Sequence, residues 1–129
     1  MNFTVKKTLE SSLARTGVLA TPHGNVQTPV FMPVGTYGAV RGLLPWELDE
    51  LGTEIILGNT YHLHLRPGEN LIASHGGLQK WSQWNKPILT DSGGYQAYSL
   101  GTTRLNSAKT TDDGVSFQSH LDGRELQFT

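Results

Sequence analysis

The sequence predicts an α/β protein with a parallel sheet, preceded at its N-terminus by an antiparallel β ribbon. Short apolar runs alternate with segments of helical pattern in the order strand, helix, strand, helix, strand, which is typical of parallel α/β folds. Strand-forming segments and a turn are found near the N-terminus, and 15 glycines among the 129 residues indicate many tight turns. We therefore treat residues 1–129 as a single domain.

The expected ribbon lies in the first 25 residues. Residues 3–9 contain strand formers in loose alternation, and residues 15–20 can pair with them. Residues 21–25 combine threonine, proline, glycine and asparagine, a composition typical of a turn. These features predict the antiparallel arrangement of this region.

Three continuous apolar runs supply the expected parallel strands, since a strand that is covered on both faces is apolar along its whole length. They occupy residues 29–34, 54–57 and 87–90. Helical patterns occupy residues 45–51, 67–75 and 78–84. The first of these helices begins with Pro45 and carries acids in its first turn, and Gly52 follows as a C-cap.

The pattern is weaker beyond Asp91. Residues 114–118 and 124–128 predict a hairpin around a turn at residues 121–123. Three parallel strands with open edges would make a poor independent fold, and a complete α/β barrel usually needs about 250 residues. We therefore expect the domain to be incomplete within this chain.

Composition excludes several classes of protein. The net charge of −1 comes from 10 Lys and Arg against 11 Asp and Glu, so a dominant basic face for nucleic acid is not expected. The absence of cysteine excludes disulfides and thiolate metal sites within the chain. No signal-peptide pattern and no apolar run of membrane-spanning length are present, which predicts a cytoplasmic protein without membrane contact.

The most informative segment for function is residues 90–96, Thr-Asp-Ser-Gly-Gly-Tyr-Gln, which directly follows a predicted strand. In parallel α/β proteins the carboxyl ends of the strands carry the active site. Asp91 can accept N–H donors from a base bound there, and Tyr95 can stack on a planar ring. The candidate site residues are Asp91, Ser92, Gly93, Gly94, Tyr95 and Gln96.

The other members of this segment fit the same chemistry. Ser92 and Gln96 add hydrogen-bond donors and acceptors, while Gly93 and Gly94 allow a ligand to approach the backbone closely. Two alternatives remain open. Asp91 could cap its own backbone in an Asx turn, or the segment could form an anion-binding nest for phosphate.

A second polar segment, residues 58–68, also follows a predicted strand and contains His62 and His64. Alternate residues at a strand end point the same way, as at the start of some barrel metallohydrolase sites. We favour the structural alternative, in which one histidine packs and the other is exposed, because two ligands make only half a site. Residues 112–123 contain acids and His120, but their Asp-Gly pairs are more typical of turns.

Four blocks, in order along the chain, resemble the tRNA-guanine transglycosylase (queuine tRNA-ribosyltransferase) family in its bacterial, queuosine-forming branch. They are TPVFMPVGT at 28–36, GNTYHL with LRPG within 58–68, PILTDSGGYQ at 87–96, and DGV with SHLDG within 113–123. The resemblance covers essentially the whole chain and corresponds to the N-terminal portion of the family's catalytic barrel.

The resemblance implies a partial TIM (β/α)8 barrel preceded by the N-terminal ribbon. It implies exchange of guanine for a 7-deazaguanine, a queuosine precursor, at the wobble position of tRNA, through a covalent RNA–enzyme intermediate. The implied partners are tRNA, the guanine and 7-deazaguanine bases, and a second copy of the full-length protein in a homodimer.

Residue by residue, the resemblance implies that Asp91 contacts the base and accepts its proton. Tyr95 is then expected to stack on the base, and Gln96 to hydrogen-bond its polar edge, while His62 and His64 are structural. The remaining substrate-binding residues that it implies are Ser92, Gly93 and Gly94.

The family's nucleophilic aspartate and its zinc ligands fall beyond Thr129, so we expect this chain alone to be inactive and to hold no zinc. Gln118 stands where the family usually has arginine. Two other functions remain open: a naturally truncated, non-catalytic remnant that binds a base or RNA, and a barrel metallohydrolase that uses His62 and His64. Asp91→Asn is expected to weaken base recognition and to leave folding largely intact.

Overall fold

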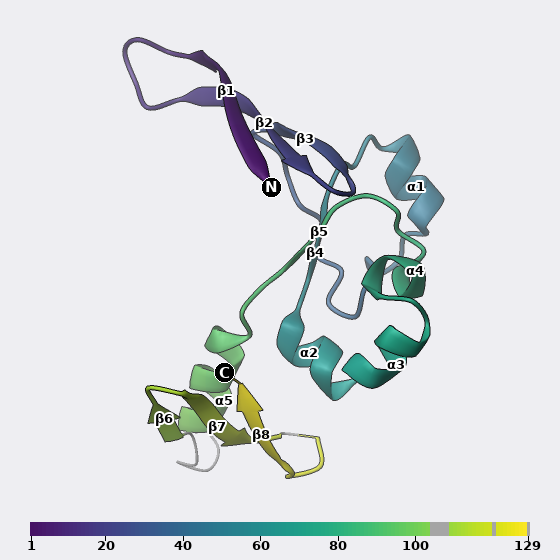
Figure 1. Ribbon diagram of the computed structural model, residues 1–129, viewed down its shortest axis with the longest axis vertical. Helices are drawn as coiled ribbons and strands as arrows, with labels where there is room; N and C mark the ends of the chain where they lie inside the picture. Colours follow the sequence, from purple (N-terminus) through teal and green to yellow (C-terminus); the bar gives the residue numbers. More distant parts are fainter. Residues whose placement is uncertain (104–108, 120, 129) are drawn as a thin grey trace.

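The computed structural model describes residues 1–103, 109–119 and 121–128. The elements form three groups along the chain: an N-terminal β ribbon, a central α/β unit, and a C-terminal helix with a small sheet (Figure 1). Within these ranges, no helix has the length and apolar character needed to cross a bilayer.

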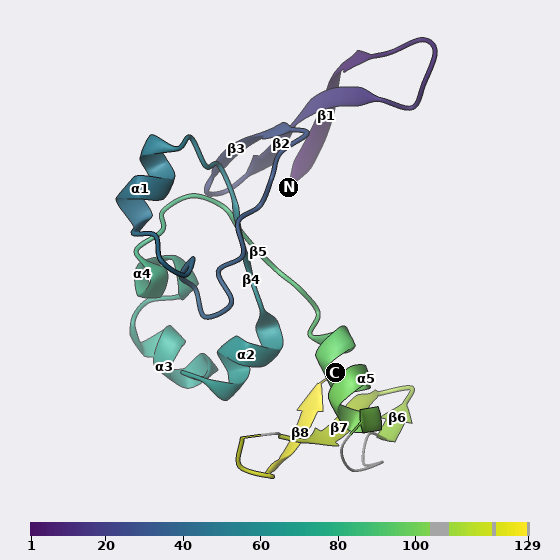
Figure 2. The same cartoon turned by 180° about the vertical axis from the view of Figure 1, so that it is seen from behind.

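The N-terminal ribbon is antiparallel, as the sequence predicts, and contains one strand more than expected. Its strands are β1 (Asn2–Thr8), β2 (Arg15–Thr21) and β3 (Gly24–Thr28), paired in that order. The expected turn connects β2 to β3. Gly17 is required in β2 because a Cβ there would lie 2.8 Å from the backbone carbonyl oxygen of Thr4, as well as 2.5 Å from Cζ of Phe3. Figure 2 shows the β1–β2 hairpin projecting away from the helices.

The central unit is built on two parallel strands, β4 (Ile56–Gly58) and β5 (Ile88–Thr90), in which Ile56 pairs with Ile88. Its helices are α1 (Pro45–Glu50), α2 (Thr60–Leu65), α3 (Glu69–Ser74) and α4 (Leu78–Ser82). Pro45 occupies the first turn of α1, as predicted. The sequence predicts α1, α3 and α4, whereas α2 is a finding of the structure.

The core of the central unit joins α1 to the strands. Leu48, Ile56 and Trp84 are buried against one another. The indole Nε1 of Trp84 donates a hydrogen bond to the carbonyl oxygen of Pro87 at 3.1 Å, so the polar atom of this buried ring is satisfied. This packing fixes the starting point of β5, and therefore the position at which β5 ends.

The prediction of a buried strand at residues 29–34 is wrong. Only Val34 makes a parallel bridge, with Leu57, and Phe31 is 81% exposed. Leu57 N donates to the Pro33 carbonyl at 2.9 Å, but Pro29 and Pro33 have no N–H to continue a ladder. The apolar run therefore follows the edge of β4 as an extended segment with a largely exposed surface.

The C-terminal group contains α5 (Gly94–Thr103) and an antiparallel sheet of β6 (Lys109–Thr111), β7 (Gly114–Gln118) and β8 (Glu125–Phe128). The predicted β7–β8 hairpin is confirmed, and the Asp-Gly segment before β7 forms a turn. The sequence did not predict α5 or β6. Tyr61 of α2 is buried against Phe117 and Leu126, which anchors this sheet to the central unit.

Three segments run parallel in the order of the sequence, because the extended chain at Val34 pairs with β4 and β4 pairs with β5. The described residues thus form an α/β unit flanked by two antiparallel sheets, without a closed barrel. The carboxyl ends of β4 and β5 meet at one edge, and the chain enters α2 and α5 from there (Figure 1). This edge carries the candidate site.

Candidate functional site

Asp91 lies at the carboxyl end of β5 and is held by residues at the carboxyl end of β4. The side-chain amide of Asn59 donates from Nδ2 to Oδ2 of Asp91 at 2.6 Å. The backbone N–H of Thr60 donates to Oδ1 at 2.8 Å. Because the strands are parallel neighbours, residues that directly follow them come together at this edge. The structure therefore places Asp91 where the sequence predicts it.

The backbone beside Asp91 is tied to β4 and α2 as well. Asp91 N donates to the Gly58 carbonyl at 3.3 Å, and the Thr60 hydroxyl donates to the Asp91 carbonyl. Asn59 is only 7% exposed, and its Oδ1 accepts from the backbone N–H of His62 at 3.0 Å, which caps α2. Asn59 thus orients both the start of α2 and the carboxylate of Asp91.

Asn59 and Thr60 were missed as site residues by the reasoning from sequence. A signal was present, since both directly follow a predicted strand just as Asp91 does. Residues that directly follow two neighbouring parallel strands lie at the same edge of the sheet, so Asn59 and Thr60 could have been predicted to lie beside Asp91.

The third donor to the Asp91 carboxylate is local. Gly93 N approaches Oδ1 at 3.3 Å, which is the Asx turn considered from the sequence. From the described residues, Oδ1 therefore accepts two hydrogen bonds and Oδ2 accepts one. A carboxylate offers about four lone-pair positions, so Oδ2 can accept one further donor. The structural role and a ligand-binding role are compatible in the same side chain.

Ser92, Gly93 and Gly94 form the bend between β5 and α5. The hydroxyl of Ser92 accepts from Gly94 N at 3.2 Å. Gly93 has a φ of +69°, and a Cβ there would lie 2.8 Å from Cε2 of Phe128. Gly93 is therefore required for packing, whereas Gly94 is exposed and close ligand approach at its backbone stays a prediction.

Tyr95 and Gln96 lie on the first turn of α5, immediately after this bend. The side chain of Tyr95 is 77% exposed, and Gln96 is half-buried. Successive helical residues point in directions about 100° apart, so the two side chains face different surroundings. The six predicted site residues are therefore divided between the segment that follows β5 and the first turn of α5, and Tyr95 is the exposed aromatic residue among them.

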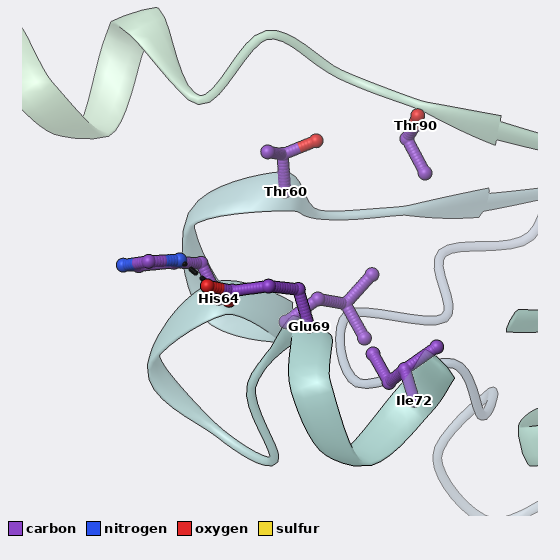
Figure 3. A pocket seen from close by; sticks show the side chains of 6 residues that line it. Thr60, His64, Glu69, Ile72 and Thr90 are labelled. Atoms are coloured by element: carbon purple, nitrogen blue, oxygen red, sulfur yellow. Dashed lines mark hydrogen bonds and ion pairs between the residues drawn. The ribbon is translucent and has the colours of Figure 1, made fainter. Parts of the chain in front are cut away.

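A cavity of about 290 Å³ lies beside this edge. Figure 3 shows Thr60 and Thr90 on one side of it and His64, Glu69 and Ile72 on the other. Nδ1 of His64 lies 2.9 Å from Oε2 of Glu69. The pKa of Glu69 is lowered, chiefly because its carboxylate accepts a hydrogen bond from its own backbone amide, with a further contribution from the charge of His64.

The strand geometry assumed for a histidine metal pair is wrong. His62 and His64 lie on helix α2, where residues two apart point about 200° apart around the axis. The ring of His62 makes edge contacts with Tyr37 and Tyr61, and His64 pairs with Glu69. Across the described ranges, no group of three or more His, Asp or Glu side chains could hold a metal. His120 lies outside the described residues.

Comparison with known proteins gives a consistent result. The family model described as queuine tRNA-ribosyltransferase matches residues 10–129. A queuine tRNA-ribosyltransferase of Oleidesulfovibrio alaskensis is 59% identical over 116 residues, which is 90% of this chain and 30% of that protein. The proteins of the same name from Aquifex aeolicus and Herpetosiphon aurantiacus are 56% and 52% identical over 120 and 128 residues. These alignments cover 90% and 99% of this chain and 32% of each relative. The chain thus spans about a third of the length of these relatives.

Proposed function

Because the chain belongs to the queuine tRNA-ribosyltransferase family, we propose that it supplies the base-recognition edge of an enzyme acting on tRNA. The reaction is exchange of guanine for a 7-deazaguanine, a queuosine precursor, at the wobble position. The observation that carries this proposal is the Asp91 carboxylate, which is fixed by Asn59 and Thr60 and on which the described residues leave one acceptor position of Oδ2 open. The exposed ring of Tyr95 follows four residues later.

In this proposal Asp91 recognises the base by accepting one of its N–H donors. When the incoming base attacks the ribose carbon, it must lose a proton, and a carboxylate within hydrogen-bond reach can accept that proton. Fixed donors on the other lone pairs of Asp91 limit the directions from which the base can approach. The nucleophile that first displaces guanine is expected beyond residue 129, so Asp91 has no nucleophilic role here.

Tyr95 and Gln96 complete the base site in this proposal. Stacking on the ring of Tyr95 requires an exposed face, which the 77% exposure of its side chain provides. Gln96 offers both an amide donor and an amide acceptor for the polar edge of a purine. The bend at Ser92 and Gly93 sets the distance between the carboxylate and the ring.

We further propose that the central unit is part of a (β/α)8 barrel. Parallel segments that follow one another in sequence order, with helices between them, fit a singly wound barrel. The apolar surface at residues 29–34 and Leu51 lines an open hollow of about 620 Å³, which suits cover by additional chain. A homodimer and a cytoplasmic location stay predictions.

Zinc is implied by the family, but the described residues of this chain do not fit it. No cysteine is present in the sequence, and no group of three or more His, Asp or Glu side chains within the described ranges could hold a metal. We therefore propose no zinc-binding role for the described residues of this chain. The family's zinc ligands remain expected beyond residue 129.

The proposed function is tested by guanine exchange. The full-length product of the gene is incubated with radiolabelled guanine and a tRNA that carries guanine at the wobble position. Incorporation of label into the RNA, and its loss in Asp91→Ala with the fold retained by circular dichroism, is the expected result. Guanine binding without incorporation would favour the non-catalytic, base-binding alternative, and full incorporation by Asp91→Ala would overturn the proposed role of Asp91.

A further inference from the structure

We propose that Tyr98 is a second stacking residue, which holds the nucleotide next to the exchanged base in the tRNA. This inference rests on the proposed function, because it extends the base site at Asp91 and Tyr95 by one turn of α5. The resemblance and the comparisons assign no role to Tyr98.

The two tyrosines of α5 share one face of the helix. Tyr95 and Tyr98 are three residues apart, so their side chains are neighbours on the surface. They are 77% and 71% exposed, whereas Tyr61 is fully buried in the core. Two large aromatic rings side by side on the surface mark an interaction site more often than a lone exposed ring does.

The position of this aromatic face relative to Asp91 is fixed by packing. Gly93 lies against Phe128 and against the Cβ of Tyr61, both of which belong to the core that joins α2 to the C-terminal sheet. The helix itself packs on β7. The bend at Gly93 is therefore held by packing at the start of the helix that carries Tyr95 and Tyr98.

The chemistry of the face favours bases over phosphates. The sequence of α5 contains no charged residue, so the helix offers no basic side chain for a phosphate and no acid that repels one. Positions three apart have their Cβ atoms about 5–6 Å from each other. That spacing exceeds the separation of two stacked bases, so each ring would take a different, unstacked base.

The reaction itself supplies a reason for a second ring. An enzyme that works on a base takes it out of the stack, and its neighbour thereby loses a stacking partner. A tyrosine one helical turn beyond Tyr95 can replace that partner for the adjacent nucleotide. Tyr98 would then select RNA with an ordered neighbouring base, whatever the identity of that base.

A double-mutant cycle, which combines protein variants with RNA variants, tests the proposal. The full-length product of the gene is titrated with three anticodon stem-loop RNAs. One is intact, the second has an abasic nucleotide on the 5′ side of the target guanine, and the third has an abasic nucleotide on its 3′ side. The proteins are the parent, Tyr98→Ala, Tyr98→Phe and Tyr95→Ala. Trp46→Ala is the matched control, because Trp46 is an exposed aromatic residue on α1, outside α5.

We expect Tyr98→Ala to weaken binding of the intact RNA by roughly 5- to 100-fold, the range found when a base loses an aromatic partner. With one of the abasic RNAs the same variant should bind as the parent does, since the contact is already missing. Tyr98→Phe should keep most of the affinity that Tyr98→Ala loses, and Trp46→Ala should match the parent with every RNA.

The remaining outcomes separate the two proposals. Equal effects of Tyr98→Ala on all three RNAs, or none, would overturn the role of Tyr98 while leaving the base site intact. Unchanged binding of all three RNAs by Tyr95→Ala would overturn the stacking of the target base on Tyr95, and with it the base site of the proposed function. Absence of RNA binding by the parent protein would overturn both.

Discussion

Asn59 donates a hydrogen bond from its side-chain amide to Oδ2 of Asp91 at 2.6 Å, and this bond joins the carboxyl ends of β4 and β5. The oxygen of the same amide accepts from His62 N at 3.0 Å and caps α2. The amide therefore cannot reverse without losing the cap. Asp91 must therefore present an oxygen acceptor to Asn59, so replacing that oxygen with an NH2 group removes the hydrogen bond.

Asp91→Asn is expected to reduce stability as well as base recognition. The new side-chain amide can still offer its oxygen to Thr60 N and Gly93 N, but its NH2 group then faces the NH2 group of Asn59. Two opposed donors cost about 1–3 kcal/mol, so the largely intact folding expected from sequence is revised. Urea unfolding measures the loss, and an unchanged free energy of unfolding would show that the bond to Asn59 contributes little.

Gly93→Ala is expected to destabilise the protein by about 2–5 kcal/mol, because a positive φ and overpacking against Phe128 act together. Gly123→Ala is the matched control, since Gly123 has a φ of +73° but open space where its Cβ would be. That variant should lose only about 1–2 kcal/mol. Thermal or urea unfolding compares the two, and equal losses would show that the contact with Phe128 is unimportant.

Tyr95→Phe is expected to keep guanine binding, whereas Tyr95→Ala weakens it by roughly 5- to 100-fold, since stacking needs the ring and not the hydroxyl. The ring is largely exposed, so neither substitution should change the unfolding midpoint measurably. Calorimetric titration with guanine measures the affinities. Parent-like affinity in Tyr95→Ala would remove Tyr95 from the site.

Glu69 is expected to make the stability slightly pH-dependent. Its pKa is lowered in the folded protein, chiefly by the hydrogen bond from its own backbone amide, so its ionised form favours folding. This contribution is present above the ordinary pKa of 4.5 and is lost as the pH falls through the lowered value. Because the side chain is exposed, the loss should be under about 0.5 kcal/mol. Glu69→Gln should remove it, as measured by urea unfolding at pH 7 and pH 3.

The elements that follow from local chemistry could be predicted from the sequence. Pro45 with a following acid indicates the start of α1, and the apolar run before Asp91 indicates β5. Residues 29–34 misled the prediction, because their apolar character is that of a buried strand while two prolines prevent the ladder. Helix α5 was missed because its sequence starts with glycine and has little periodic apolar pattern.

Asp91 could be predicted as a site residue because it directly follows a strand. Its partners could not be read from periodicity, since Asn59 and Thr60 lie 32 and 31 positions away in sequence and meet Asp91 only through the pairing of β4 with β5. The sequence predicts close approach of a ligand at Gly93, whereas in the structure Gly93 lies against the ring of Phe128. That contact depends on β8, which is remote in sequence.

We propose that the Asp91 carboxylate takes part in the reaction as well as joining the ends of β4 and β5. This proposal is tested most directly by combining Asn59→Asp with Asp91→Asn, which reverses donor and acceptor within the same hydrogen bond. The exchanged carboxylate can still cap α2, and the exchanged amide can still accept from Thr60 N.

Guanine exchange into tRNA is measured together with urea unfolding for the parent, Asp91→Asn and this double variant. We predict that the double variant recovers stability to within about 0.5 kcal/mol of the parent, because the pair is restored. Exchange should remain at least 100-fold below the parent, because the base site has lost its proton acceptor. Recovery of exchange together with stability would contradict the account and leave Asp91 a purely structural residue.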